Sequence, residues 1–221
     1  MAEVEVKEKE PLFSKKNKRL ITDPLNDNNP VTIQVLGICS ALAVTVQLDN
    51  AIVMSLAVTA VLVIGNIVVS LLRSLVPPRI RIIVQLVIVA SLVILVDIVL
   101  KAFVYDVSKQ LSVFVGLIIT NCIIMGRLEA FAMGNKPWAS ALDGVGNGLG
   151  YGFVLIVVAV FKELFGSGSL TVPGFDKFQI FAEGSGYLHN GLMLLPPSSL
   201  VLVAVYIWIQ KTRNKKLIEE H

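Results

Sequence analysis

The chain has 221 residues, of which 55% are apolar and only 16% charged, and its mean hydropathy is +0.76. About a quarter of the residues in a soluble domain are charged, and disordered chains are polar, so this composition excludes both classes. It indicates an all-α polytopic membrane protein, long enough for about six spans of ~20 residues. The net charge of +3 comes from basic residues in tails and short loops, which does not predict nucleic-acid binding.

Six apolar stretches predict the spans, at about residues 31–48, 51–75, 80–102, 111–125, 144–165 and 193–209. Polar residues interrupt the first, and the fourth reaches only ~22 Å at helical rise, so both are expected to be short or broken. The expected organisation is an N-terminal tail (1–30) with a surface helix near Lys15 to Leu20, a three-helix repeat (31–103), a second three-helix repeat (108–210) and a C-terminal tail (211–221).

The distribution of Lys and Arg predicts the orientation in the membrane. With the N-terminus inside, the outer loops hold only four of the 19 basic residues, namely Lys101, Lys109, Lys162 and Lys177. This is a strong positive-inside pattern, so both tails are expected to be cytoplasmic. With three spans in each half, the second half then runs opposite to the first, as in transporters built from inverted repeats.

Two cysteines, Cys39 and Cys122, occupy matching positions in the first and fourth stretches. Short, polar-interrupted stretches at matching positions of inverted halves indicate a site near the middle of the membrane, where the two thiols are expected to approach each other. Three interpretations stay open: inert buried thiols, ligands of a metal or iron–sulfur cluster, or a disulfide. Because a [2Fe–2S] cluster needs four ligands and no His lies in the expected spans, a partner would have to supply two more.

Asp97 is a carboxylate inside the third stretch, one helical turn before Lys101. A charge within a span costs roughly 2.5–3.5 kcal/mol on the insertion scale, so it needs a partner or water. Asp97 is interpreted either as an interfacial side chain paired with Lys101 or as part of a cation pathway.

Other charged residues lie at the ends of the stretches. Arg127 with Glu129, and Lys162 with Glu163, are expected to anchor span ends at the membrane interface. Asp143 directly precedes the fifth stretch and is expected to cap its helix. None of these residues is assigned a chemical role.

The fifth stretch opens with a run of glycines in two rows. Gly144, Gly148 and Gly152 recur every four residues, and Gly146 and Gly150 form a second row. A dinucleotide-binding loop is excluded because no strand precedes the run and no acidic residue follows at the required distance. The spacing instead predicts close packing of helices against both rows.

Several long runs of the sequence resemble a known family, the membrane subunits of the sodium-translocating NADH:quinone oxidoreductase and of the related Rnf electron-transport complex. The two cysteine segments carry most of the resemblance, at residues 37–45 (GICSALAVT) and 120–127 (TNCIIMGR). Support comes from residues 108–119 (SKQLSVFVGLII), 129–133 (EAFAM) and 146–153 (GNGLGYGF). Together the resemblance covers about residues 28–210.

The resemblance implies a membrane component of the bacterial inner membrane with two inverted three-helix halves, paired with a homologous E subunit of opposite orientation. It implies that Cys39 and Cys122, with two cysteines of that partner, hold a [2Fe–2S] cluster inside the membrane. It also implies a six-subunit enzyme that passes electrons from NADH to ubiquinone and exports Na⁺. The NADH, flavin and quinone sites would lie on the other subunits.

A second class of function stays open beside this one. In an inverted-repeat cation transporter or channel component, Asp97 would coordinate the cation and the cysteines would only pack. A scaffold that merely seals a complex is a third interpretation. Visible absorption separates them, since only a protein with a bound cluster is coloured.

Overall fold

The computed structural model describes residues 15–25, 28–103, 115–166, 169–170, 178–179 and 191–213. Its long helices are α3 (Leu48–Leu72), α4 (Arg81–Phe103), α8 (Pro137–Gly166) and α10 (Pro196–Arg213). The short helical segments are α1 (Lys15–Thr22), η1 (Asp23–Leu25), α2 (Ile38–Val44), α6 (Val115–Ile119), α7 (Cys122–Arg127), the π-helical turn η2 (Leu128–Ala132) and α9 (Gly191–Leu194). Two strands of two residues each, β1 (Ser169–Leu170) and β2 (Phe178–Gln179), pair in antiparallel fashion. Turns and irregular segments connect these elements in the described part of the chain.

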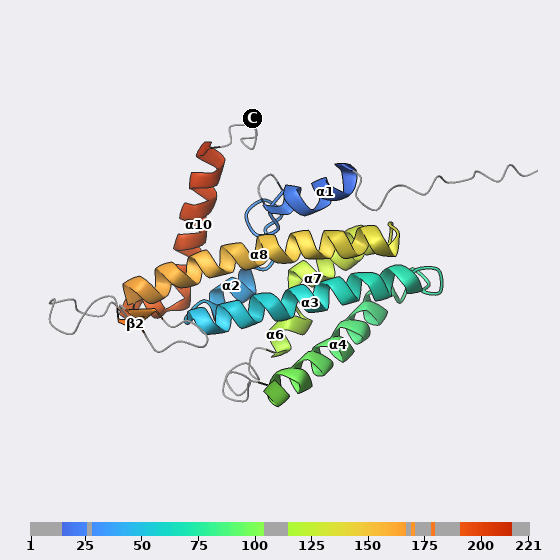
Figure 1. The fold of residues 1–221 in the computed structure, drawn as a ribbon, viewed down its shortest axis with the longest axis horizontal. Helices are drawn as coiled ribbons and strands as arrows, with labels where there is room; N and C mark the ends of the chain where they lie inside the picture. The colour runs from blue at the N-terminus through green and yellow to red at the C-terminus, as the bar shows by residue number, and fades with distance from the viewer. Residues whose placement is uncertain are drawn as a thin grey trace, which may run out of the picture.

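Helices α3 and α8 lie side by side and form the centre of the molecule (Figure 1). The first row of glycines permits this approach, as predicted. A Cβ at Gly148 would lie 2.6 Å from the Oγ1 of Thr59, and one at Gly152 would collide with the side chain of Ser55. A hydrogen bond also joins the two helices: the Nδ2 of Asn66 in α3 donates to the backbone carbonyl of Ser140 in α8, at 2.9 Å. The predicted close packing along this row is confirmed.

The N-terminal segment packs against the second row of glycines, Gly146 and Gly150. A Cβ at Gly146 would lie 2.5 Å from the carbonyl oxygen of Leu20 in α1, and one at Gly150 would lie 2.5 Å from that of Pro24 in η1. Asn29 adds a bond from its Nδ2 to the carbonyl of Gly150, at 3.2 Å. The predicted surface helix is therefore present as α1, and it packs against α8 (Figure 1).

The first and fourth predicted spans are short and broken, as expected. In the first, an irregular segment runs from residue 28 to residue 37 before α2 begins. The side-chain oxygen of Asn29 stabilises this segment by accepting from the backbone N–H groups of Val31 (2.9 Å) and Thr32 (3.3 Å). In the fourth, Thr120 and Asn121 separate α6 from α7. The short helices α2 and α7 that follow the breaks pack against α3. Within the breaks, Asn29 and Asn121 form hydrogen bonds with Gly150 and Tyr151 of α8.

Three helices among the described residues are long and apolar enough to cross a membrane: α3, the Arg81–Val99 part of α4, and α8. The predicted set of six spans in two inverted repeats is not confirmed. Helix α10 is shorter and stands at a steep angle to α8 (Figure 1). The tails before residue 15 and after residue 213, and most of the loop between α8 and α9, lie outside the described residues.

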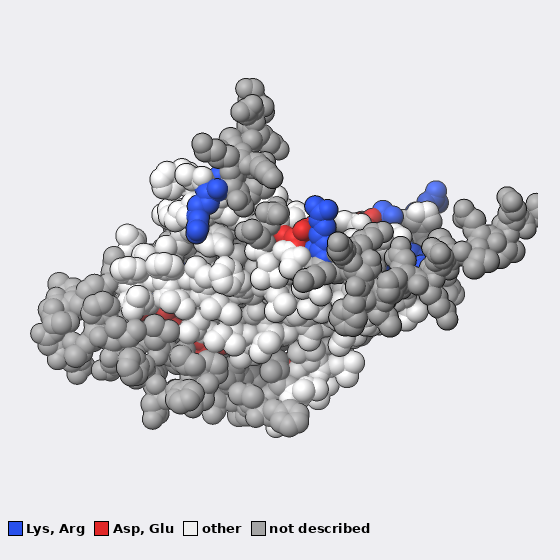
Figure 2. All heavy atoms as spheres, turned by 45° about the horizontal axis from the view of Figure 1, so that its top comes forward, with Lys and Arg blue, Asp and Glu red and all other residues white. Residues whose placement is uncertain are grey.

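Much of the apolar surface is not covered by the chain itself. Helix α4 exposes a set of large apolar side chains, namely Ile82, Ile83, Val87, Ile94, Leu95, Ile98 and Val99. Among the described residues on the face that Figure 2 shows, uncharged residues (white) predominate and Lys and Arg (blue) are few. Contact of so much apolar surface with water would be strongly unfavourable, so lipid or a partner protein must cover it.

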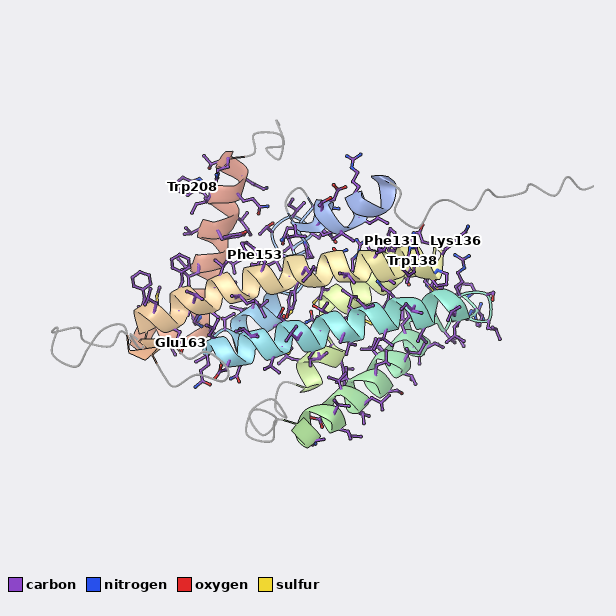
Figure 3. All side chains as sticks on the ribbon, in the orientation of Figure 1. Phe131, Lys136, Trp138, Phe153, Glu163 and Trp208 are labelled. Atoms are coloured by element: carbon purple, nitrogen blue, oxygen red, sulfur yellow. The ribbon has the colours of Figure 1, made fainter. Side chains whose placement is uncertain are left out.

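The expectation that Lys162 and Glu163 anchor a span end at the interface is wrong. Lys162 is fully buried and donates from Nζ to the Oγ of Ser199 on α10, at 2.8 Å. Glu163 is 3% exposed and lies where α8 ends beside the start of α3 (Figure 3), at the opposite end of α8 from Lys136. Its Oε2 accepts from the backbone N–H of Leu48 at 2.8 Å, so it satisfies an end group of α3 that has no side-chain cap of its own.

The expected role of Asp143 as a helix cap is also wrong. Helix α8 begins seven residues earlier than predicted, at Pro137 rather than at Gly144, so Asp143 lies in its second turn. There its side chain is buried and forms an ion pair with Arg127. Arg127 thus turns inward, and Glu129 pairs with Arg81 of α4 instead of accompanying Arg127 at the interface.

Candidate functional site

The two cysteines approach each other, as the sequence predicts. The Sγ atoms of Cys39 and Cys122 lie 3.5 Å apart, although 83 residues separate them in the chain. Both are free thiols and both are exposed. The sulfurs are well beyond the ~2.0 Å of a disulfide bond, so the disulfide interpretation is not supported by this geometry.

Each cysteine lies at the start of a short helix. Cys39 is the second residue of α2, and Cys122 is the first residue of α7. The two helix starts therefore place the two sulfurs side by side.

Local sequence explains why both helices begin there. Gly37, directly before α2, has a φ of +82°, in the left-handed region that glycine adopts without strain. Asn121, directly before α7, caps that helix because its side-chain oxygen accepts from the backbone N–H of Ile123, at 3.3 Å. The breaks before the two cysteines are thus set by one glycine and one asparagine.

The pair of sulfurs has the geometry of half a metal site. A tetrahedral ion with metal–sulfur bonds of about 2.3 Å places two of its sulfurs roughly 3.8 Å apart, close to the separation of Cys39 and Cys122. Over the described part of the chain, no group of three or more His, Cys, Asp or Glu residues is placed to hold a metal. The two sulfurs therefore fit two ligand positions of a metal centre, and any further ligands would come from outside the described residues.

Three buried polar side chains lie directly behind the cysteines, and sequence reasoning did not single them out. Ser40 follows Cys39, Asn121 precedes Cys122, and Tyr151 comes from the middle of α8. Their proximity depends on the packing of α8 against both cysteine segments. The one feature of the sequence that points to this cluster is the position of Tyr151 inside the run of glycines.

Asp97 forms its hydrogen bond within α4 and not with the cysteine segments. It accepts from Lys101, one turn later on α4, at 2.6 Å, and its side chain is 17% exposed. The predicted pairing with Lys101 is confirmed. The role of Asp97 in a cation pathway stays a prediction.

Arg127 and Asp143 form a buried ion pair that joins α7 to α8. Arg127 donates from Nε to the Oδ2 of Asp143 at 3.0 Å, and Asn147 donates to the Oδ1 of the same carboxylate at 3.0 Å. The guanidinium also lies over the ring of Phe131, 5.4 Å from its centroid. The pair ties the helix that starts at Cys122 to the central frame.

Replacing Arg127 by methionine is expected to destabilise the protein by roughly 3–5 kcal/mol, because the buried carboxyl group of Asp143 would lose its ion-pair partner. Arg81→Met is the matched control, since its partner Glu129 is about a third exposed and such pairs contribute about 0–1 kcal/mol. The thermal midpoint of the purified complex measures both. Equal midpoints for the two variants would contradict the structural role of the Arg127–Asp143 pair.

Comparison with known proteins yields one family and several similar curated proteins. The family described as "Rnf-Nqr subunit, membrane protein" matches residues 17–207. A protein of Photobacterium profundum, named as the D subunit of Na(+)-translocating NADH-quinone reductase, is 59% identical over 195 residues, which cover 88% of this chain and 92% of that protein. A protein of the same name from Pseudoalteromonas atlantica is 54% identical over 206 residues, 93% of this chain and 97% of its own. The chain therefore belongs to the Rnf-Nqr family of membrane protein subunits.

Proposed function

We propose that this chain is the D subunit of a Na⁺-translocating NADH-quinone reductase, and that Cys39 and Cys122 supply half the ligands of a [2Fe–2S] cluster. The observation that carries the cluster proposal is the 3.5 Å separation of the two sulfurs at two helix starts from distant parts of the chain. The names of the similar proteins support the assignment to the D subunit.

The missing ligands come from a homologous partner, the E subunit, in this proposal. A [2Fe–2S] cluster needs four ligands, and the described chain offers a pair of thiols that face outward. Two cysteines presented by a related protein in the same manner would complete the set. The apolar surface that α4 exposes supports an arrangement in which a membrane partner covers part of the chain.

The cluster, when bound, accepts and passes on one electron at a time. Electrons derived from NADH must cross about 30 Å of hydrocarbon to reach a carrier on the other side, and a centre within the membrane shortens each transfer. The chain's own residues hold the sulfurs, because Gly37 and Asn121 set the starts of the two short helices to which the cysteines belong. Flavin, NADH and ubiquinone sites belong to other subunits in this proposal.

The proposal also includes the setting of the protein. It lies in the bacterial inner membrane with both termini cytoplasmic, as the positive-inside pattern supports. Electron transfer through it is coupled to Na⁺ export by the complex, and Asp97 is one candidate point on the cation pathway. The names of the similar proteins support the first part, and the place of Asp97 in a helix long and apolar enough to cross a membrane supports the second.

Iron and acid-labile sulfide in the purified complex test the cluster proposal. Cys122→Ala is expected to lose the two irons and two sulfides of one [2Fe–2S] cluster relative to the parent complex. Thr212→Ala, an exposed position on α10, is the control and is expected to keep both. An unchanged iron and sulfide content in assembled Cys122→Ala would contradict the proposal.

A further inference from the structure

A closed network of hydrogen bonds lies behind the cysteine pair, on the side away from the exposed sulfurs. Tyr151 donates from its hydroxyl to the Oγ of Ser40 at 2.7 Å, and Ser40 donates in turn to the carbonyl of Gly37 at 2.7 Å. The Nδ2 of Asn121 lies 3.4 Å from the Oγ of Ser40 and 3.5 Å from the hydroxyl of Tyr151. Tyr151, Ser40 and Asn121 are at most 3% exposed.

The network joins the two cysteine segments to each other through neighbours of the cysteines. Ser40 is adjacent to Cys39, and Asn121 is adjacent to Cys122 and caps the helix that starts there. A shift of either segment would therefore break at least one of these bonds. In a buried, apolar setting the freed polar groups have no water to bond, so such a shift is costly.

Tyr151 also fixes the entry to α2 by its shape. A Cβ at Gly37 would lie 2.9 Å from the Cε2 of the Tyr151 ring and 3.7 Å from the Oδ1 of Asn121. The ring thus occupies the space that a side chain at residue 37 would need. Tyr151 belongs to the long helix α8 and contacts Gly37 and Asn121, the residues directly before α2 and α7. These contacts therefore fix the starts of both short helices relative to α8.

We propose that Tyr151, Ser40 and Asn121 act as positioning residues that set the separation of the Cys39 and Cys122 sulfurs. This inference rests on the proposed cluster, which it deepens. None of the three ligates the cluster: they lie on the buried side and hold the segments from which the sulfurs project. Partners of metal ligands in this position commonly change metal affinity or activity by about 10- to 100-fold when they are replaced.

Tyr151→Phe in the whole complex is the sharpest test, because the ring against Gly37 stays and only the hydroxyl is lost. The variant is expected to assemble with full iron, to release the iron of this cluster to a chelator about tenfold faster than the parent, and to shift the midpoint potential of its EPR signal. Ser40→Ala removes the acceptor of the same bond, so the acceleration of iron release in the double variant is expected to be smaller than the product of the two single accelerations. Tyr206→Phe, a half-buried tyrosine on α10, is the control and is expected to match the parent.

A second variant covers the case in which Tyr151→Phe does not assemble. Asn121→Ser keeps a residue that can cap α7 and loses the amide that reaches Ser40 and Tyr151, and the same faster release and shifted potential are expected. Parental release and potential in the assembled variants would overturn the positioning role and leave the cluster proposal intact. If Cys39→Ala, measured alongside, keeps its iron and EPR signals, the cluster proposal and this inference both fail.

Discussion

Replacing Cys39 or Cys122 by alanine is expected to abolish quinone reduction by the complex while NADH oxidation with an artificial electron acceptor continues. The reason is that, under the proposed function, each variant removes one of the four ligands of the [2Fe–2S] cluster and thereby interrupts the electron path through the membrane. NADH oxidation with an artificial acceptor stays, because the acceptor takes electrons before they reach this site. The loss of quinone reduction should exceed the about 10- to 100-fold effects of changes around metal ligands.

Paired assays on one preparation measure this prediction. The rate of quinone reduction is divided by the rate with the artificial acceptor, which corrects for the amount of assembled enzyme. Ser91→Ala is the control, because Ser91 is exposed on α4 and donates only within its own helix, to the carbonyl of Val87. A parental ratio in both cysteine variants would contradict an electron-transfer role for this chain.

Gly150→Ala is expected to lower the stability of the assembled protein by about 1–3 kcal/mol, because the added Cβ has no room. It would lie 2.5 Å from the carbonyl oxygen of Pro24 and 3.3 Å from the Cδ of Pro30. The closest of these atoms belongs to the backbone, so relief requires the whole N-terminal segment to move away from α8. The clash must also outweigh the gain of about 1 kcal/mol that alanine brings to a helix interior.

Gly116→Ala is the matched control for this change. A Cβ at Gly116 in α6 meets nothing within 4 Å, so the same substitution is expected to be neutral or stabilising there. The temperature at which each purified complex loses half of its quinone reductase activity gives the comparison. Equal temperatures for the two variants would show that the N-terminal segment does not depend on close contact with Gly150.

The parts of the fold that follow local rules could be predicted from the sequence. The spacing of the α8 glycines predicted two packing rows, and the structure has α3 on one and the α1–η1 segment on the other. The polar breaks beside Cys39 and Cys122 predicted short segments and the approach of the two thiols. Each of these depends on residue types at fixed spacing, which is visible in the chain.

The errors arise where tertiary contacts decide the outcome. Asp143 was assigned to a helix start because the apolar stretch begins at Gly144, whereas Pro137, a residue favoured in the first turn, marks the start of α8. Lys162 and Glu163 resemble interfacial charges in the sequence, but Ser199 of α10 and the start of α3 cover them. No local pattern reveals which distant helix will cover a charged residue.

The buried residues behind the site escaped prediction for the same reason. Ser40 and Asn121 are ordinary polar residues in their own segments, and their link through Tyr151 exists only once α8 packs against both. The buried pair of Arg127 and Asp143 likewise depends on the place where α7 meets α8. The two candidate ligands are thus visible in the sequence, whereas the residues that pack behind them are visible only in the fold.

Low-temperature EPR of the reduced complex, parent against Cys39→Ala, tests the central claim most directly. The two thiols are proposed to bind one end of a [2Fe–2S] cluster, so the variant is expected to lose one reduced-cluster signal while the signals of the other centres keep their intensity. An unchanged spectrum in the assembled variant would contradict the claim. It would leave Cys39 and Cys122 as packing residues and favour a cation-transport role without a redox centre in this chain.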